Sequence, residues 1–158
     1  MGNVLYDALF APHAQSGRDF LILPDGATVS YREFVAEIAR LAGALVALGV
    51  EPGDRVVVQA PKSARALALY GACVQSGAVL LPLNTAYTPA EVDYFVGDAR
   101  PRVLVCDPAS VERLEPIARA QGAVLQTLDA SGDGSLAGLA AQQPARFETV
   151  PRDEDDLA

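Results

Sequence analysis

Apolar residues recur along the chain in two patterns, one typical of helices and one typical of buried strands. Phe34, Ile38, Leu41 and Leu45 are spaced by three and four residues, which places them on one face of a helix. Short runs of consecutive apolar residues instead predict strands that are covered on both faces. The predicted strands are Arg55–Gln59, Val79–Leu83, Arg102–Cys106 and Ala123–Leu128, and the later predicted helices are Ser63–Ser76, Pro89–Ala99, Ser110–Gln121 and Ser135–Gln143.

The pattern of residues 1–30 predicts a peripheral element of structure. Val4–Ala11 has the spacing of a short helix, and Phe20–Leu23 predicts a short strand that ends at the turn Pro24-Asp25-Gly26. We therefore expect this segment to contribute a hairpin or an edge of a sheet. After Pro144 the pattern fades, and the run Asp153–Asp156 is entirely acidic.

Strands that alternate with helices indicate βαβ units, which require right-handed crossovers and a mostly parallel sheet. The sequence therefore predicts an α/β fold, namely a Rossmann-like, mostly parallel sheet of about five strands with helices on both faces. Residues 1–150 are assigned to this unit, as a partial N-terminal α/β subdomain, and residues 151–158 to an acidic tail or a truncation point.

Two helix starts carry a capping box, in which a hydroxyl residue and a glutamate three positions later bond to each other's backbone amides. Ser30 pairs with Glu33 in this way, and Thr88 pairs with Glu91. Pro82 lacks an amide hydrogen, so it is expected at a strand end or in an edge strand.

Composition excludes several classes of protein. The 158 residues include 12 Lys and Arg against 20 Asp and Glu, a net charge of −8, and 51% of the residues are hydrophobic. Such a chain is apolar enough to fold and too acidic to favour nucleic acid. One His and two distant Cys make a disulfide scaffold or a structural metal site unexpected. No apolar run approaches the ~20 residues of a membrane span, and Met1–Phe10 lacks a basic leader, so a cytoplasmic chain is expected.

The loops that follow the strands are the first places to look for a ligand site, because open α/β sheets bind ligands there. Lys62-Ser63 precedes a helix like the end of a phosphate loop, but the glycines that such a loop needs are absent. Gly132–Gly138 resembles a dinucleotide fingerprint with one extra spacer, although Asp133 would repel a pyrophosphate. The favoured interpretations are that Ser63 caps the helix that follows it, with Lys62 solvated, and that Gly132–Gly138 is a plain connecting loop.

The remaining reactive residues form no recognisable catalytic set. His13 stands alone near Pro12, and both Cys73 and Cys106 fall in apolar segments where core packing is expected. Asn84 follows a predicted strand. It either bonds to its own loop or lines the wall of a ligand cleft.

Several motifs occur in the order found in one enzyme superfamily. Val29–Phe34 resembles the first core motif of adenylate-forming enzymes, and Val74–Asn84 resembles the second, with Gly53–Val56 lying between them as it does in that superfamily. The run Pro82–Thr88 and the segment Val105–Pro108 are similar to malonyl-CoA synthetases in particular.

The resemblance implies the first part of the large N-terminal domain of the acyl-CoA synthetase fold. The whole enzyme would join malonate or a similar acid to CoA through an acyl-adenylate, using ATP and Mg²⁺. The phosphate loop, the acidic ribose motif and the adenylation lysine of that family match no position here. No catalytic, cofactor-binding or metal residue is therefore assigned, and the 158 residues are expected to hold no cofactor, to be inactive alone and to require the remainder of the enzyme chain as partner.

Two alternatives remain open at this stage. One is a stand-alone α/β module that binds a nucleotide at Gly132–Gly138. The other is a docking domain that self-associates or pairs with a partner through an exposed sheet edge.

Overall fold

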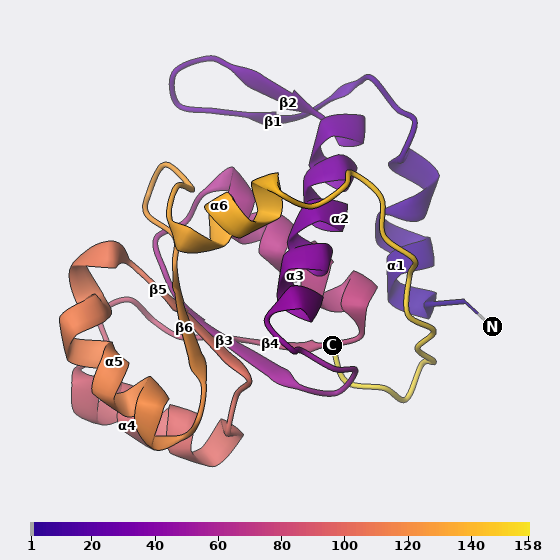
Figure 1. The fold of residues 1–158 in the computed structure, drawn as a ribbon. Coiled ribbons are helices and arrows are strands. Elements are labelled where there is room, and N and C mark those ends of the chain that lie inside the picture. The colour runs from indigo at the N-terminus through magenta and orange to yellow at the C-terminus, as the bar shows by residue number, and fades with distance from the viewer. Residues whose placement is uncertain (1) are drawn as a thin grey trace.

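A four-stranded parallel sheet forms the centre of the molecule in a computed structural model that describes residues 2–158 (Figure 1). The strand order is β4-β3-β5-β6. The strands are β3 (Arg55–Gln59), β4 (Val79–Pro82), β5 (Val103–Cys106) and β6 (Val124–Thr127). This arrangement confirms the α/β fold, and the predicted strand bounds differ from the observed ones by at most one residue at either end.

Helices cover both faces of this sheet (Figure 1). One face is covered by α2 (Tyr31–Ala47), α3 (Ala64–Ser76) and α6 (Ser135–Ala141), and the other by α4 (Pro89–Ala99) and α5 (Val111–Ala120). There are also two short 3-10 helices: η1 (Ala11–His13) lies near the N-terminus, and η2 (Pro108–Ser110) directly precedes α5. Within residues 2–158 no helix combines the length and the apolar character that crossing a membrane would need.

The run of consecutive valines in β3 explains why two separate cores form. Side chains alternate between the two faces of a strand, so neighbouring residues pack on opposite sides. Val56 is fully buried in the cluster under α2 and α3, whereas Val57 is fully buried in the cluster under α4 and α5. The β3 strand is thus apolar at successive positions because helices lie on both sides of it.

The parallel sheet has four strands, whereas about five were expected. The strand that was predicted at Phe20–Leu23 is β1 (Asp19–Ile22), and it pairs antiparallel with β2 (Thr28–Ser30) in a separate hairpin. The tight turn after β1 brings the chain straight back, so the strand pairs locally and does not join the sheet. The expectation of a peripheral hairpin within residues 1–30 is confirmed, and the helix α1 (Val4–Leu9) of the same segment packs against α3.

Both capping boxes are present. The Ser30 hydroxyl oxygen accepts from the Glu33 amide at 3.3 Å, and the Ser30 amide donates to the Glu33 carboxylate at 2.8 Å. Thr88 and Glu91 make the same reciprocal pair at 3.4 and 2.7 Å. These hydrogen bonds to the charged form lower the pKa of Glu33 and the pKa of Glu91.

The segment after Pro144 is ordered by specific hydrogen bonds although its sequence has no periodic pattern. It runs in extended form past the end of α3 and beside α1 (Figure 1). The Val150 amide donates to the Gln75 carbonyl at 2.9 Å, and the Asn3 side chain donates to the Val74 and Val150 carbonyls at 2.8 and 3.0 Å. The acidic run after Arg152 is exposed, as a solvated tail would be.

Candidate functional site

A hollow with a volume of about 1150 Å³ opens at the carboxyl end of the parallel sheet. We call it the carboxyl-edge groove. Its walls are Leu21–Leu23 of the hairpin together with Leu80 and Pro82–Thr85 of β4 and its following loop, and its floor is Val58 with the start of α3. The lining is mainly apolar, with polar groups gathered where the strands end. This is where open α/β sheets bind ligands.

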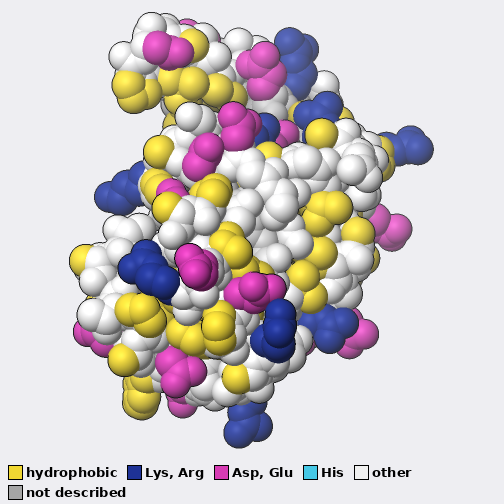
Figure 2. Space-filling model, turned by 60° about the vertical axis from the view of Figure 1, so that its left-hand side comes forward, with side chains coloured by type: hydrophobic (Ala, Val, Ile, Leu, Met, Phe, Trp, Pro, Cys, Tyr) yellow, Lys and Arg dark blue, Asp and Glu magenta, His cyan; other side chains and the backbone are white. Residues whose placement is uncertain are grey.

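The charge around the groove is sparse. Lys62 is the one charged residue in its lining, and within residues 2–158 it makes no ion pair. Elsewhere, acidic and basic side chains are interspersed over the face seen in Figure 2, where the hairpin projects from the body. The surface in that view therefore presents no continuous basic patch of the kind that a polyanion needs.

The Lys62-Ser63 loop has the capping role that its sequence favoured. The Ser63 hydroxyl oxygen accepts from the Ala66 amide at 3.0 Å and so caps the start of α3. Lys62 is exposed. A single flexible ammonium group beside one capped helix start is a weak anion site, because no set of free amides surrounds it.

Gln59 organises the loop that forms one polar wall of the groove. It is the last residue of β3 and is only 6% exposed. Its side-chain Nε2 donates to the carbonyl oxygens of Asn84 and Tyr87 at 2.9 and 3.1 Å. Sequence analysis missed this residue, although a polar side chain that ends an apolar strand is a usable signal.

Asn84 bonds within its own loop and also lines the groove, so its two interpretations are compatible. Its Oδ1 accepts from the Ala86 amide at 2.9 Å, which is the local turn that was expected. Asn84 also lines the carboxyl-edge groove. The bond within the loop therefore fixes the side chain of a residue that lines the groove.

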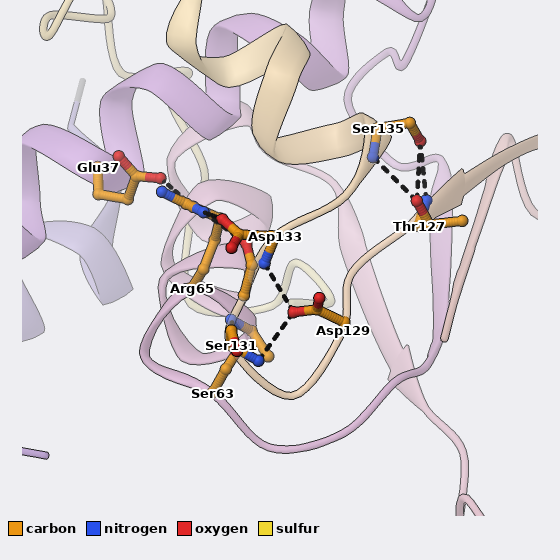
Figure 3. Close-up of polar contacts among 10 residues, drawn as sticks. Glu37, Ser63, Arg65, Thr127, Asp129, Ser131, Asp133 and Ser135 are labelled. Carbon is orange, nitrogen blue, oxygen red and sulfur yellow. Dashed lines mark hydrogen bonds and ion pairs between the residues drawn. The ribbon is translucent and has the colours of Figure 1, made fainter. Parts of the chain in front are cut away.

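The Gly132–Gly138 loop does not have the free amides of a phosphate cradle (Figure 3). The Asp129 carboxylate accepts from the amides of Ser131 and Asp133 at 2.8 and 2.9 Å. The Ser135 amide donates to the Thr127 hydroxyl at 2.9 Å. Because these amides already have acidic or hydroxyl partners, this loop does not fit a nucleotide phosphate.

Arg65 links the same loop to helix α2 (Figure 3). Its Nε lies 2.6 Å from the Glu37 carboxylate of α2, and its Nη1 donates to the Gly132 carbonyl and lies 3.6 Å from the Asp133 carboxylate. The sequence analysis did not identify this contact, since its partners are distant in the chain. The loop therefore serves as a structural connection between β6 and α6.

The residues considered as nucleophiles lie apart from the groove. His13 packs against Tyr31 with the two rings tilted and their centroids 4.7 Å apart. Complete burial raises the pKa of Cys73, and burial with the nearby Asp107 carboxylate raises the pKa of Cys106 to about 11. Both thiols are therefore neutral near pH 7 and poorly nucleophilic. No group of three or more metal-ligating side chains occurs among the residues that the structure describes.

Comparison with known proteins connects this fold to one family. The family model described as "AMP-binding enzyme" matches residues 10–158. The crystal structure of apo MatB from Rhodopseudomonas palustris superposes with a TM-score of 0.95 and 43% identity, covering 99% of this chain and 31% of that chain. A feruloyl-CoA synthase from Amycolatopsis is 36% identical over 111 residues, which are 70% of this chain and 22% of that protein.

A more distant structure shares the fold alone. A benzoate CoA ligase from Burkholderia xenovorans LB400 superposes with a TM-score of 0.79 at 21% identity, over 98% of this chain and 31% of that one. The chain thus spans less than a third of the length of each of these relatives. With the family model matching nearly all of its residues, the chain belongs to the AMP-binding enzyme family.

Proposed function

We propose that this chain is the N-terminal segment of an ATP-dependent carboxylate–CoA ligase that activates malonate or a similar small acid. The observation that supports the proposal best is the 43% identity to MatB across 99% of the chain. Within the run Pro82–Thr88, which is similar to malonyl-CoA synthetases, the residues Pro82–Thr85 line one wall of the carboxyl-edge groove. Gln59 holds this wall in place.

The reaction of such a ligase has two steps. A carboxylate oxygen of the acid attacks the α-phosphorus of ATP and the bond to pyrophosphate breaks, giving an acyl-adenylate. The CoA thiol then loses its proton, its sulfur attacks the acyl carbon and AMP departs. In this scheme the residues described here build and shape one side of the site, and they carry no bond-making step.

The 158 residues by themselves are proposed to be inactive. A triphosphate needs several converging donors or cations. The loop that could have supplied amides is bonded internally, and Lys62 is a single exposed charge. The net charge of −8 adds a general repulsion toward ATP.

The test is an ATP–pyrophosphate exchange assay on two proteins, the 158-residue chain and the full product of its gene. The full product is expected to catalyse exchange with malonate faster than with methylmalonate, acetate or benzoate. The 158-residue chain is expected to show none. Exchange by the short chain would overturn the proposed inactivity, and a preference of the long chain for benzoate or acetate would overturn the choice of malonate.

The contacts around Gly132–Gly138 argue against the alternative of a stand-alone nucleotide-binding module. Titration of the 158-residue chain with NAD, FAD and ATP is therefore expected to leave its melting temperature unchanged. A ligand in large excess over its dissociation constant would raise that temperature by mass action.

A cytoplasmic location of the protein is also part of the proposal.

A further inference from the structure

The carboxyl-edge groove lies where the chain leaves the sheet in two opposite directions. β3 and β4 are neighbouring parallel strands. The helix after β3, α3, covers one face of the sheet, whereas the helix after β4, α4, covers the other. The loops after these two strands therefore diverge and open a crevice between them, and open α/β sheets bind ligands at this kind of position. Residues of both loops line the groove.

Lys62 supplies the only charge in this crevice. It belongs to the loop between β3 and α3, and it is exposed. None of the residues that line the groove is acidic, and within residues 2–158 Lys62 forms no ion pair. The positive charge of Lys62 is therefore not offset by a partner side chain.

The start of α3 adds to the positive potential at this end of the groove. A helix has a partial positive charge at its amino end, and an acidic residue in the first turn offsets it. The helices α2, α4 and α5 have Glu33, Glu91 and Glu112 in their first turns, whereas the first turn of α3 has no acidic residue. The α3 cap is the neutral hydroxyl of Ser63, and Lys62 directly precedes it.

The apolar walls of the groove strengthen this field. A charge beside low-dielectric walls acts over a longer distance than the same charge on an open, polar surface. The protein as a whole has a net charge of −8, so it repels anions in general. The end of the groove at Lys62 is thus a positive position on an acidic molecule.

The substrates of the proposed reaction indicate what this charge can bind. ATP and CoA both carry several phosphate charges. A lysine ammonium binds phosphate oxygens as a point charge, whereas a planar carboxylate is matched better by the forked side chain of arginine. A phosphate group therefore suits Lys62 better than malonate does.

We propose that Lys62 recruits a nucleotide substrate of the ligase by pairing its ammonium with a phosphate group of ATP or CoA at the carboxyl-edge groove. This inference rests on the proposed function, from which it takes the two nucleotides. Lys62 is one contact among several, and the remaining contacts come from the rest of the enzyme chain. Lys62 acts on binding and takes no part in bond making.

Steady-state kinetics of the full gene product test this role with three variants. Lys62→Gln removes the charge, and Lys62→Arg keeps it. Arg146→Gln makes the same change in net charge at an exposed residue that lies outside the groove lining and forms no ion pair within residues 2–158.

We expect Lys62→Gln to raise the KM for one nucleotide about 5- to 10-fold at low salt, with kcat and the KM for malonate unchanged. The nucleotide whose KM rises is the one that Lys62 contacts. Lys62→Arg and Arg146→Gln should both keep KM values within about twofold of the unmodified enzyme. Unchanged KM values for both nucleotides in Lys62→Gln, or an equal rise in Arg146→Gln, would overturn the proposal.

Salt dependence distinguishes an electrostatic contact from a structural one. Because salt screens exposed charges, the rise in KM caused by Lys62→Gln should shrink to less than about twofold in about 0.5 M NaCl. A packing defect would persist at that salt concentration. A rise in KM that salt leaves intact would therefore also contradict the proposal.

Calorimetric titration of the same proteins with ATP and with CoA separates this inference from the proposed function. A protein that binds a nucleotide more weakly after Lys62→Gln, but does not activate malonate, contradicts only the proposed function. A protein that activates malonate and binds both nucleotides equally well with and without the Lys62 charge contradicts only the role of Lys62.

Discussion

Replacing Gln59 with leucine removes the donor that joins the end of β3 to the loop after β4. Gln59 is 6% exposed and makes two hydrogen bonds, to Asn84 and Tyr87, at 2.9 and 3.1 Å. Each such bond contributes about 1 kcal/mol net. Because Asn84 is exposed and its carbonyl can be rehydrated, we expect Gln59→Leu to lower the free energy of unfolding by about 1–2 kcal/mol.

Urea denaturation followed by circular dichroism measures this loss. With a slope of about 2 kcal/mol per molar urea, the unfolding midpoint should fall by about 0.5–1 M. Gln59→Glu is the matched variant because it keeps the size but turns a carboxylate toward two carbonyl oxygens. It should be less stable than Gln59→Leu at pH 7, since the folded state favours the neutral form and so raises the pKa of this glutamate. It should regain stability as pH falls through that raised folded pKa, and the gain should be complete below the pKa of the unfolded glutamate. An unchanged midpoint for Gln59→Leu would refute the role assigned to Gln59.

Three further predictions concern a cap, a turn and a thiol. Ser30→Ala should cost about 1 kcal/mol of stability. The Ser30 hydrogen bonds lower the pKa of Glu33 in the folded state, so their contribution to stability is present above the pKa of unfolded Glu33 and is lost as pH falls through the pKa of folded Glu33. The cost of Ser30→Ala, measured by urea denaturation, should therefore shrink in acid. Gly134→Ala should lower the melting temperature, because a Cβ would lie 2.3 Å from the Thr127 carbonyl oxygen at a φ of +144°, whereas Gly138→Ala meets no atom within 4 Å and should leave that temperature equal or higher. Cys73 should resist a thiol reagent at pH 8 in the native protein and react in urea, and rapid native labelling would contradict its burial.

Local sequence signals were sufficient for most element bounds. Pro82 correctly indicated an edge strand or strand end, and the Ser30 and Thr88 boxes correctly marked the starts of α2 and α4. These features depend on residues within a few positions of each other. The order β4-β3-β5-β6 could not be predicted in this way, because pairing between strands depends on contacts between distant segments.

The features that sequence analysis missed are long-range and polar. Asn3 connects to Val74 and Val150 across more than seventy positions, so the segment after Pro144 is ordered without any hydrophobic period. Arg65 joins Glu37 to the loop at Gly132 in the same way. A single hydrogen bond between distant residues leaves no repeat in the sequence, so pattern analysis has nothing to detect.

The alternation of side chains along β3 separates the interior into two compartments with few shared atoms. Substitutions more than about 7–10 Å apart that share no partner generally change stability independently. Leu69 lies in the compartment under α2 and α3, and Val96 in the one under α4 and α5. Engineering of this protein can therefore optimise each compartment separately and combine the results by simple addition, whereas changes at Val56 and Val57 would couple the two through the backbone that they share.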